Sequence, residues 1–298
     1  MQYDGIVVGG SFAGLAAALY LGRARRSVCV LDTGLPRNRF AAASHGLFGQ
    51  DGSDPKTLLT TMRHQISAYP TVHFINEAAV EATREADRIK VALSGGSTIE
   101  GARLLLAFGV SDILPIIPGL PERWWKSVLH CPYCHGYEVS GQRLGVMNIS
   151  STSLQQALLV SDWGPTTFYM NGAEMDGPGL DQLKRRGVEI EPDLVAGLLG
   201  EHDGLSAIQF ADGRSRPLDA LFISPQNRLN STIAEGIGCN TQNGPLGQII
   251  TTDEMKMTTV EGVFAAGDIT RAMHNITFGC ADGVMAAMAI HRSLVLQN

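Results

Sequence analysis

The sequence predicts an α/β fold built from two Rossmann-like domains, with the second domain inserted in the first. Short apolar strands alternate with helical segments, a glycine-rich turn follows the first strand, and a second strand–helix unit begins near residue 143. The length of 298 residues is comfortable for two domains. The 34 glycines exceed the average share of about 7 %, as expected where many turns follow buried strands.

The composition indicates a chain with substantial hydrophobic cores and no particular affinity for nucleic acid. Apolar residues make up 44 %, and 29 acidic residues against 23 basic ones give a net charge of -6. The sequence shows no basic leader and no apolar run near the ~20 residues that span a bilayer. We therefore expect a soluble cytoplasmic protein that binds neither nucleic acid nor a membrane.

The first strand leads into a turn of the kind that binds a dinucleotide. Residues 4–8 predict a β-branched strand, residues 15–21 a helix, and residues 27–31 a second strand that ends at Asp32. In such a turn the helix N-terminus holds a pyrophosphate, and an acid about 20 residues further on binds ribose hydroxyls. Serine replaces the middle glycine and is still small. The predicted cofactor-binding residues here are Gly9, Gly10, Ser11, Phe12, Ala13, Gly14 and Asp32.

The rest of the first domain predicts a loop, a helix and several strands. In the loop, Arg37 and Arg39 either bind phosphate or remain solvated, and His45 fits a structural and a functional role equally well. A helix is expected over 54–67, and strands over 72–75, 79–85, 89–93 and 104–107. Three prolines between residues 115 and 121 then predict a crossing into the inserted domain.

The inserted domain begins with an expected strand over 143–149 and a helix over 154–160. The turn over 148–153 reads Asn-Ile-Ser-Ser-Thr-Ser, and it lacks the glycines of a pyrophosphate site. The next strand, 166–171, is not followed by a basic cluster for a 2′-phosphate. We also expect a helix over 180–187 and strands over 205–210 and 218–224.

The last segment of the chain returns to the first domain. A strand over 263–266 is followed by Gly267 and Asp268, and an Asp in that position can bind a ribitol hydroxyl. A helix is expected over 282–296, and the dipole at its N-terminus would stabilise a reduced, anionic flavin. The predicted domain segments are 1–114 and 246–298, which form a cofactor domain, and 115–245, which forms a degenerate nucleotide-binding domain.

Two cysteines stand three positions apart in the stretch His130-Cys131-Pro132-Tyr133-Cys134-His135. This spacing allows a small-ring disulfide that exchanges readily with a dithiol, and a neighbouring histidine can take a thiol proton. Half of a zinc site, a c-type haem attachment and two inert cysteines are the competing interpretations. The sequence holds no second metal-ligand pair, so no metal site is predicted. The remaining cysteines are expected to be buried small hydrophobes: Cys29, Cys239 and Cys280.

In combination, these motifs resemble those of the low-molecular-weight thioredoxin reductases. The matching segments are 8–15, 131–134 and 262–268, and their order and spacing agree along nearly the whole chain. The resemblance implies FAD as cofactor, a homodimer, and a thioredoxin-like protein or small dithiol as partner. It places Cys134 against the flavin and makes Cys131 the exchanging sulfur. The further FAD contacts expected from it are Val80, Ala107, Gly109, His274, Asn275 and Ile276. Arg39, Gly267 and Asp268 complete the predicted cofactor-binding residues.

The chain departs from that family at positions that bear on its chemistry. His135 stands where the family usually has an Asp as proton donor. The form Cys-x-x-Cys-His-Gly-Tyr-Glu resembles a subgroup that includes dithiol oxidases of the gliotoxin and holomycin type and thioredoxin reductases that do not use pyridine nucleotides. The second glycine fingerprint and the basic motif for a 2′-phosphate are both missing.

The sequence therefore predicts an FAD-dependent dithiol/disulfide oxidoreductase with Cys131, Cys134 and His135 as catalytic residues. Dithiols are expected to reduce it and dioxygen to reoxidise it, without NADH or NADPH. Two alternatives stay open. One is a thioredoxin reductase fed by ferredoxin or another non-nicotinamide donor, and the other is a flavin-binding sensor or regulatory protein whose cysteines are idle.

Overall fold

The computed structural model describes residues 2–175 and 177–296, which form two compact units. Unit 1 contains residues 2–39, 55–111 and 227–296, and unit 2 contains residues 40–54 and 112–226. These boundaries differ from the predicted segments, because residues 227–245 fold with unit 1. There Ile233, Ala234 and Cys239 are buried in its core. Pro245 lies in the turn of the hairpin formed by residues 241–250, so the chain does not pass between the two units at this proline.

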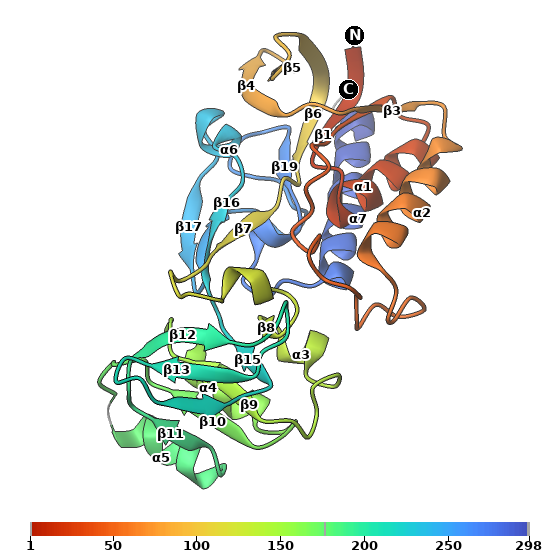
Figure 1. Cartoon of the computed structure of the whole chain (residues 1–298). Coiled ribbons are helices and arrows are strands. Elements are labelled where there is room, and N and C mark those ends of the chain that lie inside the picture. Colours follow the sequence, from red (N-terminus) through yellow and green to blue (C-terminus); the bar gives the residue numbers. More distant parts are fainter. Residues whose placement is uncertain (1, 176, 297–298) are drawn as a thin grey trace. The chain divides into compact units, whose positions relative to one another are not determined.

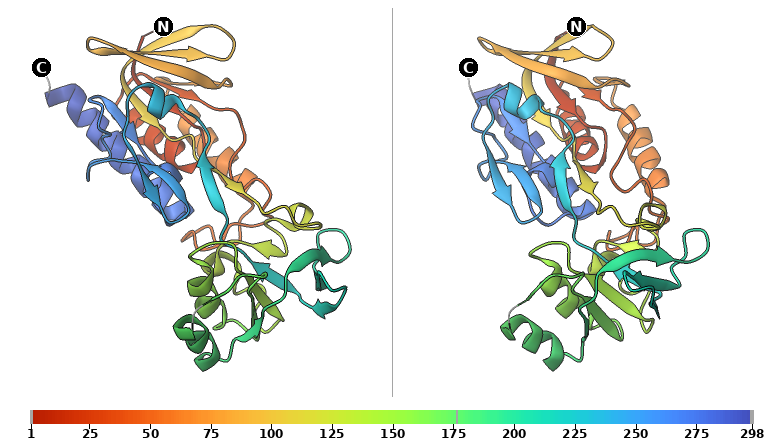
Figure 2. Two further views of the ribbon diagram at one scale, coloured as in Figure 1. Left: turned by 90° about the vertical axis from the view of Figure 1, so that its left-hand side faces the viewer. Right: turned by 60° about the vertical axis from the view of Figure 1, so that its left-hand side comes forward.

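Unit 1 holds a seven-stranded sheet in the order β3-β2-β1-β6-β5-β4, with β19 also paired to β6 (Figure 1). Its strands are parallel except for β4 and β5, which extend the sheet as antiparallel neighbours. Figure 2 shows this extension at the end of unit 1 where the chain begins. The elements are β1 (Gln2–Val8), α1 (Phe12–Arg23), β2 (Val28–Leu31), α2 (Pro55–Ser67), β3 (Val72–Ile75), β4 (Ala79–Glu85), β5 (Arg88–Leu93), β6 (Thr98–Leu106), α6 (Ile233–Gly236), β17 (Thr241–Gly244), β18 (Gly247–Ile250), β19 (Val263–Ala265), the 3-10 turn η2 (Asp268–Thr270) and α7 (Ile276–Leu296).

Both faces of this sheet are covered, so its central strands read as continuous apolar runs. In β1, Ile6 and Val8 contribute to one hydrophobic cluster and Val7 contributes to the other. In β6, the same alternation places Leu105 with the second cluster. The second cluster also takes in side chains of α1 and α7, which lie side by side (Figure 1). Packing on both faces fixes the carboxyl ends of β1, β2 and β19.

Unit 2 holds a five-stranded parallel sheet in the order β11-β10-β9-β15-β8 and a three-stranded antiparallel sheet, β12-β13-β14. Strand β8 lies at the edge of the parallel sheet. The elements are η1 (Pro121–Arg123), β8 (Val128–Leu129), α3 (Pro132–His135), β9 (Leu144–Met147), α4 (Ser153–Val160), β10 (Thr166–Tyr169), α5 (Gly177–Arg185), β11 (Glu189–Glu191), β12 (Val195–Leu199), β13 (Ala207–Phe210), β14 (Ser215–Pro217) and β15 (Ala220–Phe222). Two further strands, β7 (Val110–Ile113) and β16 (Gln226–Leu229), pair where the chain passes between the units.

The α/β class and the two Rossmann-like sheets are as predicted, but the last helix is longer than expected. Helix α7 begins at Ile276, six residues before the predicted start at Asp282. Two glycines, which are weak helix formers, lie in the first turns of α7: Gly279 before the predicted start and Gly283 within the predicted range. The structure gives the second of them a packing role, because a Cβ on Gly283 would lie 2.0 Å from the carbonyl oxygen of Ala13. This close approach lets α7 pack tightly against α1.

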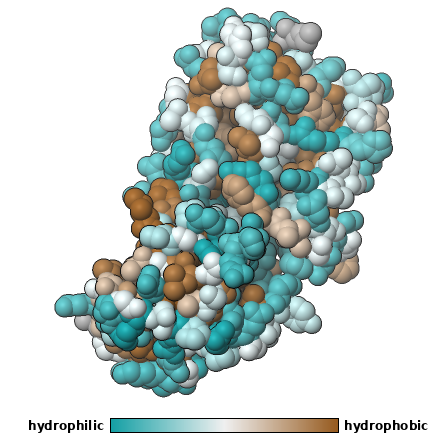
Figure 3. Space-filling view, in the orientation of Figure 1, coloured by the Kyte–Doolittle hydropathy of each residue, from teal (hydrophilic) through white to brown (hydrophobic). Residues whose placement is uncertain are grey.

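Within residues 2–175 and 177–296, no helix is both long enough and apolar enough to cross a membrane. On the face shown in Figure 3, hydrophobic surface forms small separate patches among hydrophilic residues.

Candidate functional site

The two motif cysteines form a disulfide at the start of a short helix in unit 2. Cys131 follows β8 and caps α3, and Pro132 takes the first helical position, where no N–H is needed. The Cα atoms of Cys131 and Cys134 are 5.2 Å apart. The backbone N–H groups of Cys134 and His135 both donate to the carbonyl oxygen of Cys131 at 3.2 Å. One helical turn therefore holds both sulfurs and the histidine that follows them.

The imidazole of His135 lies between two other rings. The ring centroid of Trp125 is 6.1 Å away and that of His45 is 6.2 Å away, and both contacts are edge-to-face. Burial lowers the pKa of His135, the Glu138 carboxylate raises it by less, and His45 lowers it further. His135 is therefore neutral at neutral pH, which is the form that accepts a proton from a thiol.

The histidine before the disulfide has a structural setting. Nδ1 of His130 lies 3.3 Å from the carbonyl oxygen of Ile223, which follows β15. Nε2 of Gln156 in α4 donates to the carbonyl oxygen of His130 at 2.6 Å. These contacts join the end of β8 to the neighbouring strand and helix, so His130 helps to position the disulfide turn.

In unit 2, the turn between β9 and α4 is closed by the side chain of Ser153. The hydroxyl oxygen of Ser153 is buried and accepts hydrogen bonds from the N–H groups of Ile149 and Ser150, each at 3.1 Å. The Ile149 side chain packs against the hydrophobic core of the unit. In a working dinucleotide site these N–H groups would face the pyrophosphate. Here two of them are satisfied by a side chain of the same turn.

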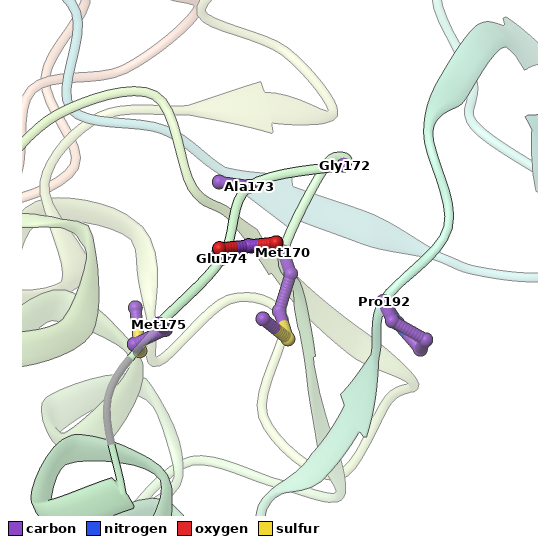
Figure 4. A pocket seen from close by; sticks show the side chains of 6 residues that line it. All are labelled: Met170, Gly172, Ala173, Glu174, Met175 and Pro192. Atoms are coloured by element: carbon purple, nitrogen blue, oxygen red, sulfur yellow. The ribbon is translucent and has the colours of Figure 1, made fainter.

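A pocket follows strand β10 in the same unit, at the sheet edge where an adenosine ribose binds in dinucleotide folds. It has a volume of about 590 Å³, and Figure 4 shows Met170 and Glu174 projecting between Met175 and Pro192. Its lining residues are Met170, Gly172, Ala173, Glu174, Met175 and Pro192. The charged side chain of this set is a carboxylate, which would repel a 2′-phosphate.

The glycine-rich turn of unit 1 forms a cradle that side chains would fill. A Cβ on Gly9 would lie 2.2 Å from the carbonyl oxygen of Ala107, and one on Gly14 would lie 1.8 Å from the carbonyl oxygen of Gly9. Gly9 also has φ +114°, which L side chains rarely adopt. Ser11 caps α1 without a side-chain hydrogen bond of its own. The backbone can therefore come close to a pyrophosphate at this helix N-terminus.

Asp32 stands at the carboxyl end of β2, beside that turn. Its carboxylate accepts a hydrogen bond from the N–H of Gly10 at 3.3 Å and pairs with Arg63 of α2. The Arg63 guanidinium also lies over the Phe74 ring, 5.2 Å from its centroid. These contacts hold a carboxylate where a dinucleotide ribose would lie, as the sequence predicts.

The carboxyl end of β19 supplies a second polar group in unit 1. Asp268 pairs with Arg37 at 3.2 Å, and Arg37 lies 2.6 Å from Nδ1 of His274. Gly267 has φ +84°, and its Cβ would lie 3.0 Å from that of Ala13. The glycine cradle, Asp32 and Asp268 thus fit the pyrophosphate, the adenosine ribose and the ribitol of FAD.

The other predicted FAD contacts differ in their surroundings. Phe12 and Ala13 are buried in the first turn of α1, while Asn275 and Ile276 stand at the start of α7. Gly109 has φ +71° in the connection that follows β6. These placements agree with a site at the carboxyl ends of the strands.

Two predicted residues stand in exposed settings. Val80 is 55 % exposed at an irregularity of β4. Arg39 donates to the carbonyl oxygen of Pro36 at 2.9 Å, on the surface. Their roles toward FAD stay predictions.

A buried carboxylate in α7 was missed by sequence reasoning. Asp282 is 1 % exposed and pairs with Lys256 at 2.7 Å and with Arg271 at 2.6 Å. It also accepts a hydrogen bond from the N–H of Gly267 at 3.3 Å. A single acid in a mostly apolar helix was the available sign. Asp282 fixes the loop that carries Asp268.

Comparisons with known proteins agree with this geometry. Residues 3–147 match the family described as pyridine nucleotide-disulphide oxidoreductase. Thioredoxin reductase tcpT of Claviceps purpurea is 30 % identical, over 98 % of this chain and 94 % of that protein. The crystal structure of the oxidoreductase from Agrobacterium tumefaciens is 42 % identical with a TM-score of 0.95 and covers 100 % of both chains. The crystal structure of HlmI is 35 % identical with a TM-score of 0.94, over 99 % of this chain and 93 % of that one.

The disulfide turn, the glycine cradle and these full-length similarities lead to one assignment. The chain belongs to the thioredoxin reductase-like members of the pyridine nucleotide-disulphide oxidoreductase family, and it is an FAD-binding flavoprotein that acts on sulfur groups.

Proposed function

We propose that this enzyme oxidises dithiols through the Cys131–Cys134 disulfide, with dioxygen as final electron acceptor and without NADH or NADPH. The observation that carries the proposal is the disulfide turn itself, in which His135 stands next to Cys134 in a buried setting that favours its neutral form. A neutral imidazole accepts a proton at the pH where a dithiol must be activated.

The first step forms a mixed disulfide. A substrate thiol gives its proton to His135, and its sulfur attacks Sγ of Cys131. A substrate–Cys131 bond forms, the Cys131–Cys134 bond breaks, and the electron pair stays on Sγ of Cys134. The helix turn keeps Cys134 next to His135 throughout, because their N–H groups share the Cys131 carbonyl.

The second step releases oxidised substrate. The second substrate thiol attacks the substrate sulfur of the mixed disulfide, and Cys131 leaves as a thiolate that is protonated in turn. Two electrons of the dithiol then reside in the cysteine pair. Bound FAD supplies a two-electron acceptor that restores the disulfide, with dioxygen reduced to hydrogen peroxide in the proposed cycle.

Independence from pyridine nucleotides is supported by two features of unit 2. Ser153 already binds the N–H groups of Ile149 and Ser150 that a pyrophosphate would need. Glu174 lines the pocket where a 2′-phosphate would lie. Both features work against the binding of a pyridine nucleotide, so in this proposal the electrons come from thiols. In this proposal, unit 1 binds FAD and unit 2 is a degenerate nucleotide domain that carries the disulfide.

The names of the relatives favour a second candidate function. The curated proteins of Leptosphaeria maculans and Claviceps purpurea that resemble this chain are both named thioredoxin reductase. The same cysteines would then reduce a thioredoxin-like partner with electrons from a non-nicotinamide donor such as ferredoxin. The homodimer that the resemblance implies stays a prediction, as does the cytoplasmic location expected from the sequence.

Mixing the oxidised enzyme with excess dithiothreitol in the absence of air, followed by admission of air, tests the proposal. We expect the flavin absorbance to bleach and then return, with one hydrogen peroxide formed per dithiol oxidised. Bleaching without reoxidation in air would favour the reductase. No bleaching at all would leave the flavin-binding sensor, whose cysteines are idle.

A further inference from the structure

The loop over residues 44–53 in unit 2 is closed by its own hydrogen bonds. The N–H of Ser44 donates to the carbonyl oxygen of Ser53 at 2.8 Å, and the N–H of Gly52 donates to that of Ser44 at 2.9 Å. Within the loop, the Asp51 carboxylate accepts a hydrogen bond from the N–H of Gly46 at 2.8 Å. The loop is therefore a defined support for the histidine that it carries, His45.

A carboxylate lies on each side of His45, and its ring contacts the ring of His135, the proposed catalytic histidine. Nδ1 of His45 lies 3.6 Å from Oδ1 of Asp51, and its Nε2 lies 3.5 Å from Oε1 of Glu138. Its ring also meets the His135 ring edge-to-face. The His45 side chain is only 20 % exposed, although the loop around it lies at the surface. Glu138 comes three residues after His135, so two segments far apart in sequence converge on one imidazole.

We propose that His45 is a positioning residue of the redox centre, which holds the His135 ring beside the disulfide and, together with Glu138, sets the charge around it. The inference rests on the proposed role of His135 in thiol–disulfide exchange. The rings of Trp125 and His45 contact the His135 ring, and Glu138 from the segment after α3 acts on its charge. Carboxylate oxygens within 3.6 Å of both ring nitrogens of His45 orient its side chain.

The two charged neighbours act on His135 in opposite directions. Glu138 raises the pKa of His135 because a carboxylate favours the imidazolium, and His45 lowers it because positive charge on a neighbouring ring disfavours the imidazolium. Exchange needs neutral His135, so its rate is lost as the pH falls through the pKa of that ring. Removing His45 should move this loss to higher pH, and removing Glu138 should move it to lower pH.

The test compares wild type with His45→Asn and Glu138→Gln in the FAD-loaded enzyme. Anaerobic opening of the disulfide by dithiothreitol is followed by acid quench, alkylation and mass spectrometry from pH 5 to 8, and the rate of His135→Ala is subtracted. We expect the half-maximal pH to shift up in the first variant and down in the second. A shift of one pH unit corresponds to about tenfold in rate on the acid side. NMR titration of the His135 ring should show the highest pKa in His45→Asn, an intermediate pKa in wild type and the lowest pKa in Glu138→Gln.

His202→Asn, a matched change at an exposed histidine of unit 2, should match wild type. Shifts of the same sign, or no shift, in the two test variants would overturn the inference while leaving the proposed function intact. If the wild-type disulfide does not open with dithiothreitol, the proposed function fails first. FAD content and circular dichroism show whether each variant is folded.

Discussion

At the residue scale, the side chain that follows Cys134 is the proposed proton acceptor of the redox centre. The family that the sequence resembles usually has an Asp there as proton donor, and this chain has His135. His135 is held neutral by burial, which lowers its pKa. Neutral imidazole is a base that a thiol can use directly, whereas an ionised carboxylate is a weak one.

Replacing His135 with Ala should slow thiol–disulfide exchange by about 10²–10⁴-fold, the usual contribution of a general base. FAD should stay bound, because His135 belongs to unit 2 and the cradle belongs to unit 1. Because the pKa of His135 is lowered, the wild-type rate should persist to below about pH 6.5 and then fall as the ring is protonated. Stopped-flow reduction by dithiothreitol measures both effects. An unchanged rate and pH profile in His135→Ala would contradict the role.

The two cysteines should respond differently to substitution. Cys134→Ser should abolish flavin reduction by dithiols, because the resemblance makes Cys134 the sulfur that passes electrons on. Cys131→Ser should leave Cys134 as a thiolate beside the oxidised flavin, and this pair should give a long-wavelength charge-transfer band. The absorption spectra of the two oxidised variants distinguish these roles. A band in Cys134→Ser instead would mean that the roles are exchanged.

Sequence reasoning found residues that belong to contiguous motifs and missed those that depend on long-range contacts. The glycine cradle and the pair Cys131–Cys134 were predicted because spacing defines them. The partnership of Arg37 with Asp268 spans 231 positions, and no local pattern reveals it. The same holds for His45, whose importance depends on which loop meets α3. These contacts arise only when the chain is folded.

At the scale of elements, some strand bounds were predicted well, whereas the start of the last helix was not. Strands β3 and β4 have the expected bounds, and turn segments flank them. The prediction left out the first six residues of α7, which include Gly279, a weak helix former. Further along the helix, Gly283 allows the close contact between α7 and α1. Tertiary packing of this kind is not visible in a local window.

The β9–α4 turn should lose stability when its serine is replaced. Ser153→Ala leaves the partly buried N–H groups of Ile149 and Ser150 without their acceptor, and we expect a loss of about 1 kcal/mol. Urea unfolding measures the change in the free energy of unfolding. Ser151→Ala, at an exposed position of the same turn, is the matched control and should change little. Equal stabilities for the two variants would contradict the account of this turn.

Asp282 should matter for both stability and cofactor affinity. Asp282→Asn leaves Lys256 and Arg271 without their buried anion, and we expect a loss of about 3 kcal/mol. The loop that carries Asp268 loses its anchor, so FAD should also dissociate more readily. Thermal unfolding and the recovery of free FAD fluorescence measure the two effects. Asp87→Asn, an exposed site in unit 1, should affect neither.

At the scale of the whole molecule, each unit contains a largely parallel sheet with a strand–turn–helix segment, but these turns differ in chemistry. In unit 1 the β1–α1 turn is open, with glycines that let the backbone approach a pyrophosphate. In unit 2 the β9–α4 turn is closed by Ser153. The parallel sheet of unit 2 also positions the redox disulfide, which follows β8 at the start of α3. This division predicts a flavoprotein whose electrons come from thiols.

Anaerobic stopped-flow mixing of the oxidised enzyme with NADPH, NADH or dithiothreitol, each in excess, tests this central claim most directly. Flavin absorbance is followed after each mixing. The account predicts rapid bleaching with the dithiol and none of comparable rate with either nucleotide, because Ser153 already binds N–H groups of the β9–α4 turn and Glu174 lines the pocket after β10. Full bleaching within about a second at micromolar NADPH, the speed of an ordinary turnover, would contradict it and make this an NADPH-dependent reductase.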